Sequence, residues 1–245
     1  MEDKDMSKKG FLGGKDSNAY IVFYSTVMVV IVAILLAFTY LSLKPAQDAN
    51  ILNEKKDAIV ASLGLEKGSY DSTIEAYVVN KEGEVIQTEV SPLNKLFDLP
   101  ASFAAGEYPV FESKTTGEVV FPLTGKGLWD DIWGYIALEA DLNTIKGAIF
   151  DHAGETPGLG AEIATAKYQA QFPGQTIYEG SKLVGIYVVK GGAQGAAHSV
   201  DAVTGGTKTS EGLQNMIKDC LDCYDAFIMG RTAVAFELVE TVNAE

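Results

Sequence analysis

A long apolar run is the most pronounced feature of the first part of the chain. Residues 19–43 contain no charged side chain, and a helix rising about 1.5 Å per residue over this length crosses a hydrocarbon core of about 30 Å with some tilt. The apolar part of a cleaved signal peptide is shorter, about 7–15 residues. The pattern predicts an uncleaved transmembrane helix over 19–43, preceded by an N-terminal arm over 1–18.

Beyond this helix the hydrophobic spacing changes twice. Residues 44–68 carry apolar positions at helical spacing among Glu, Lys and Asp, which predicts an amphipathic connecting helix. Short runs rich in β-branched and aromatic residues then predict strands over 73–79, 84–90, 118–123, 135–139, 144–151 and 183–190. A hairpin turn is expected at 81–83. The stretch 91–114 contains three prolines and is interpreted as a loop or insertion.

Helical spacing is found mainly towards the end of the chain. It predicts helices over 161–171 and 209–229. Strands and helices are therefore segregated, which indicates an α+β fold with an antiparallel β-sheet and flanking helices in one domain over 69–245.

The charge balance bears on location and partners. The formal net charge is −14, and such an acidic chain is a poor binder of nucleic acid. Four lysines in the N-terminal arm, against three soon after the apolar run, give a slight positive-inside bias. This bias favours a single-pass protein in contact with lipid, with its N-terminus in the cytoplasm and its C-terminal domain outside. In a Gram-negative bacterium this would mean an anchor in the inner membrane and a domain in the periplasm.

A glycine- and hydroxyl-rich stretch, 201–210 (Asp-Ala-Val-Thr-Gly-Gly-Thr-Lys-Thr-Ser), precedes the last predicted helix. Adjacent glycines let the backbone approach a bulky anion with its N–H groups turned inward, and Thr209 or Ser210 can cap the helix. The stretch lacks the spacing of a Walker loop. It indicates either a phosphate seat at a helix N-terminus or an ordinary glycine-rich turn.

Two further stretches are distinctive. Residues 154–160 read Gly-Glu-Thr-Pro-Gly-Leu-Gly and lie between a predicted strand and a predicted helix, where a flat ring could rest on the backbone or where the chain forms an ordinary loop. Residues 125–134 hold both tryptophans of the chain. Trp129 is a candidate for stacking near a ring, although a core position is the commoner place for a tryptophan before a strand.

Together these three motifs resemble a known family. The stretch 201–207 is similar to the Asp-x-x-Ser/Thr-Gly-Ala-Thr signature on which a flavin transferase attaches FMN, with Gly206 in place of the usual Ala. Glu-Thr-Pro-Gly-Leu-Gly and Gly-x-Gly-Leu-Trp follow the same family in order and spacing. The chain is identified as a member of the FMN-binding family that includes the C subunits of sodium-translocating NADH:quinone oxidoreductases and the G subunits of Rnf ferredoxin:NAD complexes, with the former branch favoured.

The resemblance implies an electron-carrying subunit that performs no catalysis on its own. It implies FMN joined through its phosphate to Thr207, with Thr204, Gly205, Gly206 and Lys208 beside the phosphate. Thr156, Leu159, Gly160, Trp129 and Glu155 would border the ring or influence its potential, and Asp201 would serve recognition by the flavin transferase. The implied partners are the other membrane subunits of an oxidoreductase that uses NADH, ubiquinone and sodium.

Alternatives stay open at this point. A non-redox module could use the same turn for a soluble phosphate ligand, whereas a free-standing flavin reductase is disfavoured because no Gly-x-Gly-x-x-Gly follows a strand. Cys220 and Cys223 are read as unremarkable thiols in preference to a disulfide or a metal site shared with a partner. His152 is read as a structural residue at a strand end in preference to a residue that lines a flavin pocket.

Overall fold

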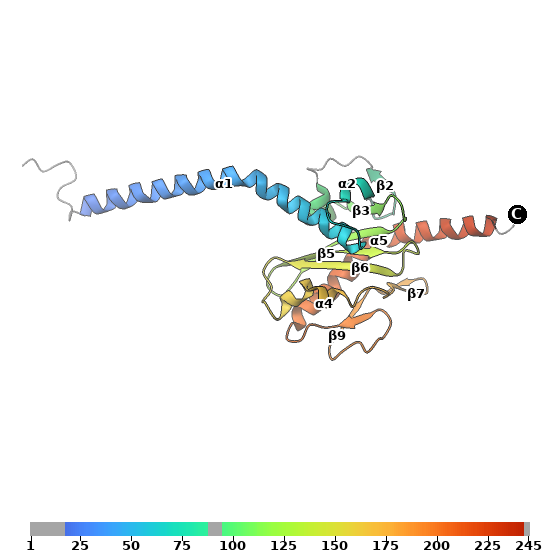
Figure 1. Cartoon of the computed structure of the whole chain (residues 1–245). Helices are drawn as coiled ribbons and strands as arrows, with labels where there is room; N and C mark the ends of the chain where they lie inside the picture. Colours follow the sequence, from blue (N-terminus) through green and yellow to red (C-terminus); the bar gives the residue numbers. More distant parts are fainter. Residues whose placement is uncertain (1–17, 88–94, 243–245) are drawn as a thin grey trace, which may run out of the picture. The chain divides into compact units, whose positions relative to one another are not determined.

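A computed structural model describes residues 18–87 and 95–242 (Figure 1). Of the predicted arm over 1–18, only the last residue lies within the described residues, and residues 88–90 of the second predicted strand lie outside them. The first elements are α1 (Asn18–Ser62), α2 (Tyr70–Thr73), β1 (Ile74–Val79), β2 (Val85–Gln87), η1 (Lys95–Phe97), α3 (Leu99–Ala104), β3 (Tyr108–Ser113), β4 (Val119–Lys126), β5 (Asp131–Leu138) and β6 (Ile145–His152). The remaining elements are η2 (Gly160–Ala164), α4 (Ala166–Gln169), β7 (Tyr178–Glu179), β8 (Lys182–Leu183), β9 (Tyr187–Val189), β10 (Ser199–Asp201) and α5 (Thr207–Val242).

Among the residues that the structure describes, six strands form one sheet in the order β2-β1-β3-β4-β5-β6. Every neighbouring pair in it is antiparallel, and the turn at 81–83 joins β1 to β2 as predicted. Two small sheets, β7 with β8 and β9 with β10, lie outside it. The predicted α+β fold with an antiparallel sheet is confirmed.

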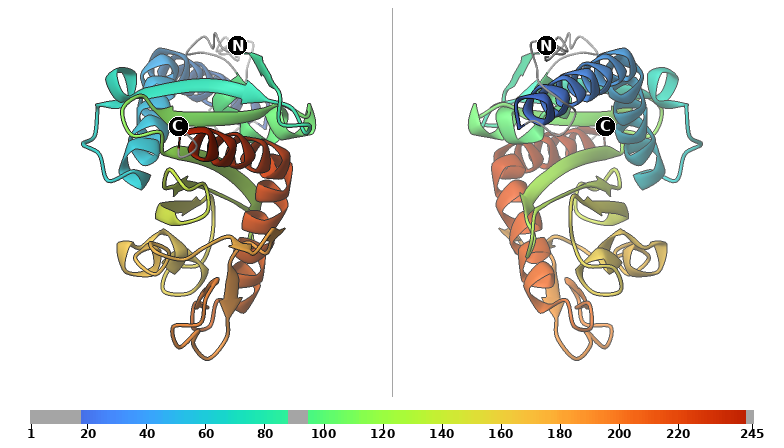
Figure 2. Two further views of the ribbon diagram at one scale, coloured as in Figure 1. Left: turned by 90° about the vertical axis from the view of Figure 1, so that its right-hand side faces the viewer. Right: turned by 90° about the vertical axis from the view of Figure 1, so that its left-hand side faces the viewer.

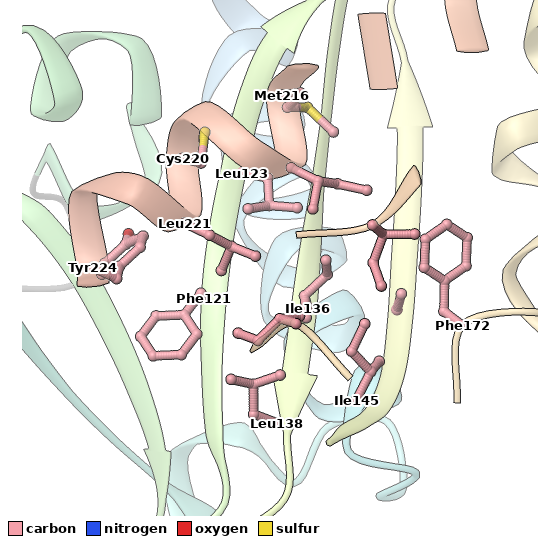
Figure 3. Packing of buried hydrophobic residues seen from close by; sticks show 14 of the residues in the cluster. Phe121, Leu123, Ile136, Leu138, Ile145, Phe172, Met216, Cys220, Leu221 and Tyr224 are labelled. Carbon is pink, nitrogen blue, oxygen red and sulfur yellow. The ribbon is translucent and has the colours of Figure 1, made fainter. Parts of the chain in front are cut away.

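Successive side chains of a strand point to opposite faces of the sheet, and both faces of this sheet are covered by buried clusters. Phe121 and Leu123 of β4 belong to a cluster with the buried residues of α5, whereas Val120 packs in a second cluster with Ile59 and Val60 near the end of α1. Figure 3 shows Met216, Cys220, Leu221 and Tyr224 of α5 facing the strand residues of the first cluster, and Figure 2 shows α5 lying along the sheet.

Within the described residues, α1 is long and apolar enough to cross a membrane by length and composition. It continues as one helix through Pro45 to Ser62, so the separate connecting helix expected from residue 44 is part of the same element. The chain divides into two compact units between Ile51 and Leu52. The last turns of α1 belong to the second unit, whose core they help to form.

The prediction of a loop over 91–114 is wrong for most of the described residues in this range, and residues 91–94 lie outside them. Residues 95–97 and 99–104 are helical, and 108–113 form β3, inside the main sheet. Asp98 caps α3 by accepting a hydrogen bond from the N–H of Ala101 at 3.4 Å. Pro109 is tolerated in β3 because the ladder with β4 comprises only Phe111 and Glu112, so the proline lies where the strand has a partner on one side only.

Two further boundaries differ from the prediction. Residues 183–190 are not one strand, because β8 ends at Leu183 and β9 begins at Tyr187, with Gly185 at a φ of +66° between them. The helix expected over 161–171 is the short pair η2 and α4, and α5 begins at Thr207, before the predicted start at 209. Runs of β-branched and aromatic residues located most strands of the main sheet but not these local interruptions.

An ion pair ties the far part of α5 to the sheet. Arg231 donates to both carboxylate oxygens of Glu112 on β3, at 2.7 and 2.8 Å, and the hydroxyl of Tyr77 on β1 donates to Glu112 Oε2 at 2.6 Å. Burial alone would raise the pKa of Glu112, but the hydrogen bonds from Arg231 and Tyr77 outweigh it, so this pKa lies below its ordinary value. The bidentate geometry makes the pair stronger than an ordinary surface ion pair.

Replacing Arg231 with Met is expected to lower the free energy of unfolding at neutral pH by about 1–2 kcal/mol, because the pair is only partly buried. A carboxyl whose pKa is depressed by folding stabilises above its unfolded pKa of about 4.3, and this contribution is lost as pH falls through the lower folded value. The difference between wild type and Arg231→Met, measured by urea unfolding, should therefore shrink below about pH 4. An unchanged difference at acid pH would contradict this assignment.

Candidate functional site

The glycine-rich stretch ends where α5 begins. Thr207 is the first residue of the helix and is exposed, and Gly205 just before it has a φ of +75°, in the region that favours glycine. The carbonyl of Gly206 accepts the N–H of Ser210 at 2.9 Å, so Gly206 occupies the capping position without a capping side chain. The N–H groups of the first helical turn have no acceptor within the helix, which suits an anion.

The hydroxyls near this helix start divide into two kinds. Thr209 donates to Glu155 at 2.6 Å and Ser210 accepts the N–H of Val203 at 3.0 Å, and both side chains are buried. The predicted capping role of Thr209 or Ser210 is therefore wrong, since both hydroxyls are used to fix the helix start internally. Thr204 and Thr207 are exposed, which leaves their hydroxyls accessible from solvent.

The second stretch forms a tight turn. The N–H of Leu159 donates to the carbonyl of Thr156 at 3.1 Å, with Pro157 and Gly158 between them and Gly158 at a φ of +75°. This is the residue pattern of a type II turn. Thr156 and Leu159 are exposed on it, while Gly160 is buried. The glycine at 205 lies against this turn, because a Cβ there would be 2.7 Å from Leu159 Cδ2.

The third stretch is the connection between β4 and β5. The N–H of Gly127 donates to the carbonyl of Asp130 at 2.9 Å, and Lys126 pairs with Asp131 beside this turn. Trp129 on the turn is 72% exposed and Leu128 is 52% exposed. The alternative that Trp129 is a core residue is wrong, and its indole is available to a ligand or partner.

Glu155 joins all three stretches. Its side chain is 4% exposed, and its carboxylate accepts the hydroxyl of Thr209 at 2.6 Å and the backbone N–H of Trp129 at 2.9 Å. Burial opposes ionisation, but the hydrogen bonds from Thr209 and from the backbone of Trp129, Asp130 and Leu128 lower the pKa of this carboxyl. Glu155 is thus a buried carboxylate held in a concave set of N–H groups.

Close backbone approach also shapes the site. A Cβ on Gly212 of α5 would lie 2.3 Å from the carbonyl oxygen of Lys126, and one on Gly125 would lie 2.8 Å from Met216 Cβ. The glycines of the third stretch and of α5 therefore allow the first turns of the helix to lie directly against the end of β4.

The other predicted site residues have partners of their own. Lys208 forms an exposed ion pair with Glu211 at 2.7 Å, and Asp201 accepts the backbone N–H of Ala193 at 2.7 Å. His152 is half-buried and accepts the N–H of Glu155 at 3.3 Å through Nδ1. A methyl group on Gly206, as in the usual signature, would approach Val203 Cγ1 to 2.9 Å, so glycine fits this turn better than alanine.

Neither cysteine contributes to the site. Cys220 and Cys223 are free thiols, and the thiol of buried Cys220 donates to the carbonyl of Thr124 at 3.3 Å. Burial raises the pKa of Cys220 to about 12, which keeps it protonated and unreactive. Within residues 18–87 and 95–242, no cluster of three His, Cys, Asp or Glu side chains could hold a metal.

Comparisons with known proteins agree with this geometry. Residues 127–222, which include all but the first two residues of the three stretches, match the family of FMN-binding domains. A crystal structure of the C subunit of the Na(+)-translocating NADH-quinone reductase from Parabacteroides distasonis superposes with a TM-score of 0.68 at 33% identity, covering 76% of this chain and 96% of that one. The Shewanella oneidensis NqrC structure gives a TM-score of 0.62 at 26% identity, covering 76% and 99%.

Sequence relatives carry the same description. The C subunit of the Pseudomonas aeruginosa Na(+)-translocating NADH-quinone reductase is 30% identical, over 89% of this chain and 97% of its own length. Its Pasteurella multocida counterpart is 46% identical over 101 residues, which are 41% of this chain and 39% of that protein. Fold and site thus define a protein with an FMN-binding domain. The chain belongs to the NqrC family, the C subunits of Na(+)-translocating NADH-quinone reductases, which are oxidoreductases.

Sequence reasoning placed the three stretches together but missed Thr209 as the partner of Glu155. The signal was weak, because the two residues are far apart in sequence and either could face solvent. The glycines at 127 and 160 were the available hint: a Cβ at these positions would lie 2.4 and 2.3 Å from the two oxygens of Glu155.

Proposed function

We propose that this chain is a membrane-anchored electron carrier with FMN covalently bound through its phosphate to Thr207. The observation that carries the proposal is the state of the hydroxyls at the start of α5. Thr209 and Ser210 are buried and engaged, whereas Thr207 is exposed as the first helical residue. Thr207 is also the position that matches the last threonine of the flavin-attachment signature.

The residues present fit FMN. The uncapped N–H groups at the start of α5 would hold the phosphate, because a helix N-terminus favours an anion. Exposed Leu159 and Trp129 would offer apolar surface to the ring, and Thr156 would offer a hydroxyl to its polar edge. When bound, FMN supplies reversible electron-transfer chemistry. Lys208 would add positive charge near the phosphate once released from Glu211.

Attachment requires an activated donor. Attachment would join the Thr207 oxygen to the flavin phosphorus, break the pyrophosphate bond of a flavin dinucleotide, and release a nucleoside monophosphate together with the hydroxyl proton. A flavin transferase would perform this step during maturation, with Asp201 contributing to its recognition of the stretch. Because Asp201 also holds the backbone of Ala193, its replacement would disturb the fold locally as well.

The chain would serve within a sodium-translocating NADH:quinone oxidoreductase, passing electrons between redox centres of the other membrane subunits. Membership of the NqrC family supports this role over that of an Rnf G subunit. The length and apolar composition of α1 support a single-pass anchor in the inner membrane. With the N-terminus in the cytoplasm, the FMN-binding domain would lie in the periplasm, where a covalent tether prevents loss of a cofactor made in the cytoplasm.

The intact mass of the full chain tests this proposal. The chain is co-expressed with a flavin transferase, exported, precipitated with acid and mapped by peptide mass. We expect a yellow precipitate and an FMN-sized increase on the peptide containing Thr207. A chain that remains colourless and unmodified, yet binds inorganic phosphate, would instead favour a non-redox phosphate-binding module.

A further inference from the structure

We infer that Glu155 is a positioning residue for flavin attachment: its buried carboxylate fixes the first turn of α5, and thereby Thr207, before the flavin arrives. This inference rests on the proposed attachment to Thr207. Sequence reasoning placed Glu155 at the ring, as an influence on its potential. The contacts instead direct it towards the protein interior, where it acts through Thr209.

The carboxylate connects two separate parts of the site. Oε2 accepts the hydroxyl of Thr209, two residues after Thr207 on the same helix, at 2.6 Å. Oε1 accepts the N–H of Trp129 in the β4–β5 turn at 2.9 Å. One side chain therefore holds the helix start against the turn that carries the exposed indole.

The backbone around Glu155 is built to enclose it. A Cβ on Gly127 would be 2.4 Å from Oε1, and one on Gly160 would be 2.3 Å from Oε2 and 2.4 Å from Thr209 Oγ1. Real Cβ atoms do not approach so closely, so any other residue at either position would displace the carboxylate or the hydroxyl. The position of the Glu155 carboxylate therefore explains why glycine occupies both 127 and 160.

The internal use of both oxygens separates Glu155 from direct flavin contact. The side chain is 4% exposed, and its two oxygens already have donors from Thr209 and Trp129. A carboxylate satisfied in this way has a fixed geometry, since moving it would leave a buried charge without partners. The hydroxyl of Thr207 thus lies on a helix turn whose position is fixed by the hydrogen bond between Thr209 and Glu155.

The experiment compares rates of attachment on the folded full chain in detergent, with purified flavin transferase and flavin dinucleotide. Thr209→Val removes the hydroxyl but keeps the shape, Thr209→Ser keeps the hydroxyl, and Glu155→Gln removes the charge but keeps the shape. Arg231→Met, about six helical turns further along α5, is the matched control for stability. Adduct formation is followed by intact mass and divided by the folded fraction from circular dichroism.

At a saturating concentration of the chain, we expect Thr209→Val to slow attachment about tenfold or more, because misplacement of a reacting group lowers the rate of the chemical step. Thr209→Ser should restore the rate to near that of wild type, Arg231→Met should leave it unchanged, and Glu155→Gln should fall between. Since the hydroxyl reacts after the chain has bound the transferase, the loss should appear in kcat and much less in KM.

Two outcomes would overturn the inference. In the first, Thr209→Val and Glu155→Gln acquire flavin as fast as wild type per folded chain. In the second, Arg231→Met slows attachment as much as they do, which would mean that the slower attachment comes only from lower stability. Should Thr209→Val not fold, Glu155→Gln decides the question. A wild-type chain that acquires no adduct under the same conditions would contradict the proposed function instead, and so the two failures are distinguishable.

Discussion

Replacing Thr207 with Val is expected to abolish covalent flavin. Valine has nearly the shape of threonine but no hydroxyl, so no phosphoester can form. Thr207 is exposed, and among the described residues its hydroxyl has no hydrogen-bond partner, so the stability of the variant should stay within about 0.5 kcal/mol of wild type. Acid precipitation followed by intact-mass measurement should give a colourless protein without an FMN-sized increase.

The neighbouring hydroxyls supply the controls. Thr204→Val removes the other exposed hydroxyl of the stretch and should still acquire the adduct on Thr207, at a reduced rate because Thr204 belongs to the attachment signature. Thr207→Ser keeps an acceptor and should also retain attachment at a reduced rate. If Thr207→Val remained yellow after acid precipitation, attachment would lie at another residue. The peptide map would then identify Thr204 as the first candidate, because Thr209 and Ser210 are buried.

Within the described residues, five of the six strands of the main sheet could be predicted from the sequence, because they lie in short runs rich in β-branched and aromatic residues. Residues 91–114 could not, since prolines normally argue against a strand. Pro109 is accepted because of a tertiary circumstance: β3 meets β4 through only two residue pairs, and the carbonyl of Pro109 accepts the hydroxyl of Tyr224 from α5 at 2.9 Å. No local pattern records either contact.

The candidate site was predictable to a similar degree. Motif chemistry singled out Thr207 and the three stretches around it, because glycines, hydroxyls and a helix start are local features. The exposure of Trp129 and the burial of Glu155 depend on packing between distant segments, so spacing alone left the first undecided and assigned the second to the ring. The close approach of α5 to the end of β4 is likewise visible only in three dimensions.

That close approach leads to the second large effect, which concerns Gly212. Replacing it with Ala is expected to destabilise the fold by about 2–4 kcal/mol, since crowding a packed interior displaces backbone. The added Cβ would lie 2.3 Å from the carbonyl oxygen of Lys126, and a backbone atom cannot move aside as a flexible side chain can. The higher helix propensity of alanine recovers only about 1 kcal/mol of this cost. Urea unfolding of the full chain in detergent measures the loss.

Gly230 provides the matched control, because it lies on the same helix and a Cβ there would meet nothing within 4 Å. Gly230→Ala should therefore raise the free energy of unfolding by about 0.5–1 kcal/mol through helix propensity and a less flexible unfolded chain. If the two substitutions change the free energy of unfolding in opposite directions, the need for glycine at 212 arises from the contact between α5 and β4. If both substitutions changed the free energy of unfolding in the same direction, helix propensity would govern both positions, and the close approach at Lys126 would be relaxed in solution.

The contact between α5 and β4 also brings the helix start to the β4–β5 turn. Gly212→Ala should therefore slow flavin attachment to Thr207 as well, while Gly230→Ala should leave the rate of attachment unchanged.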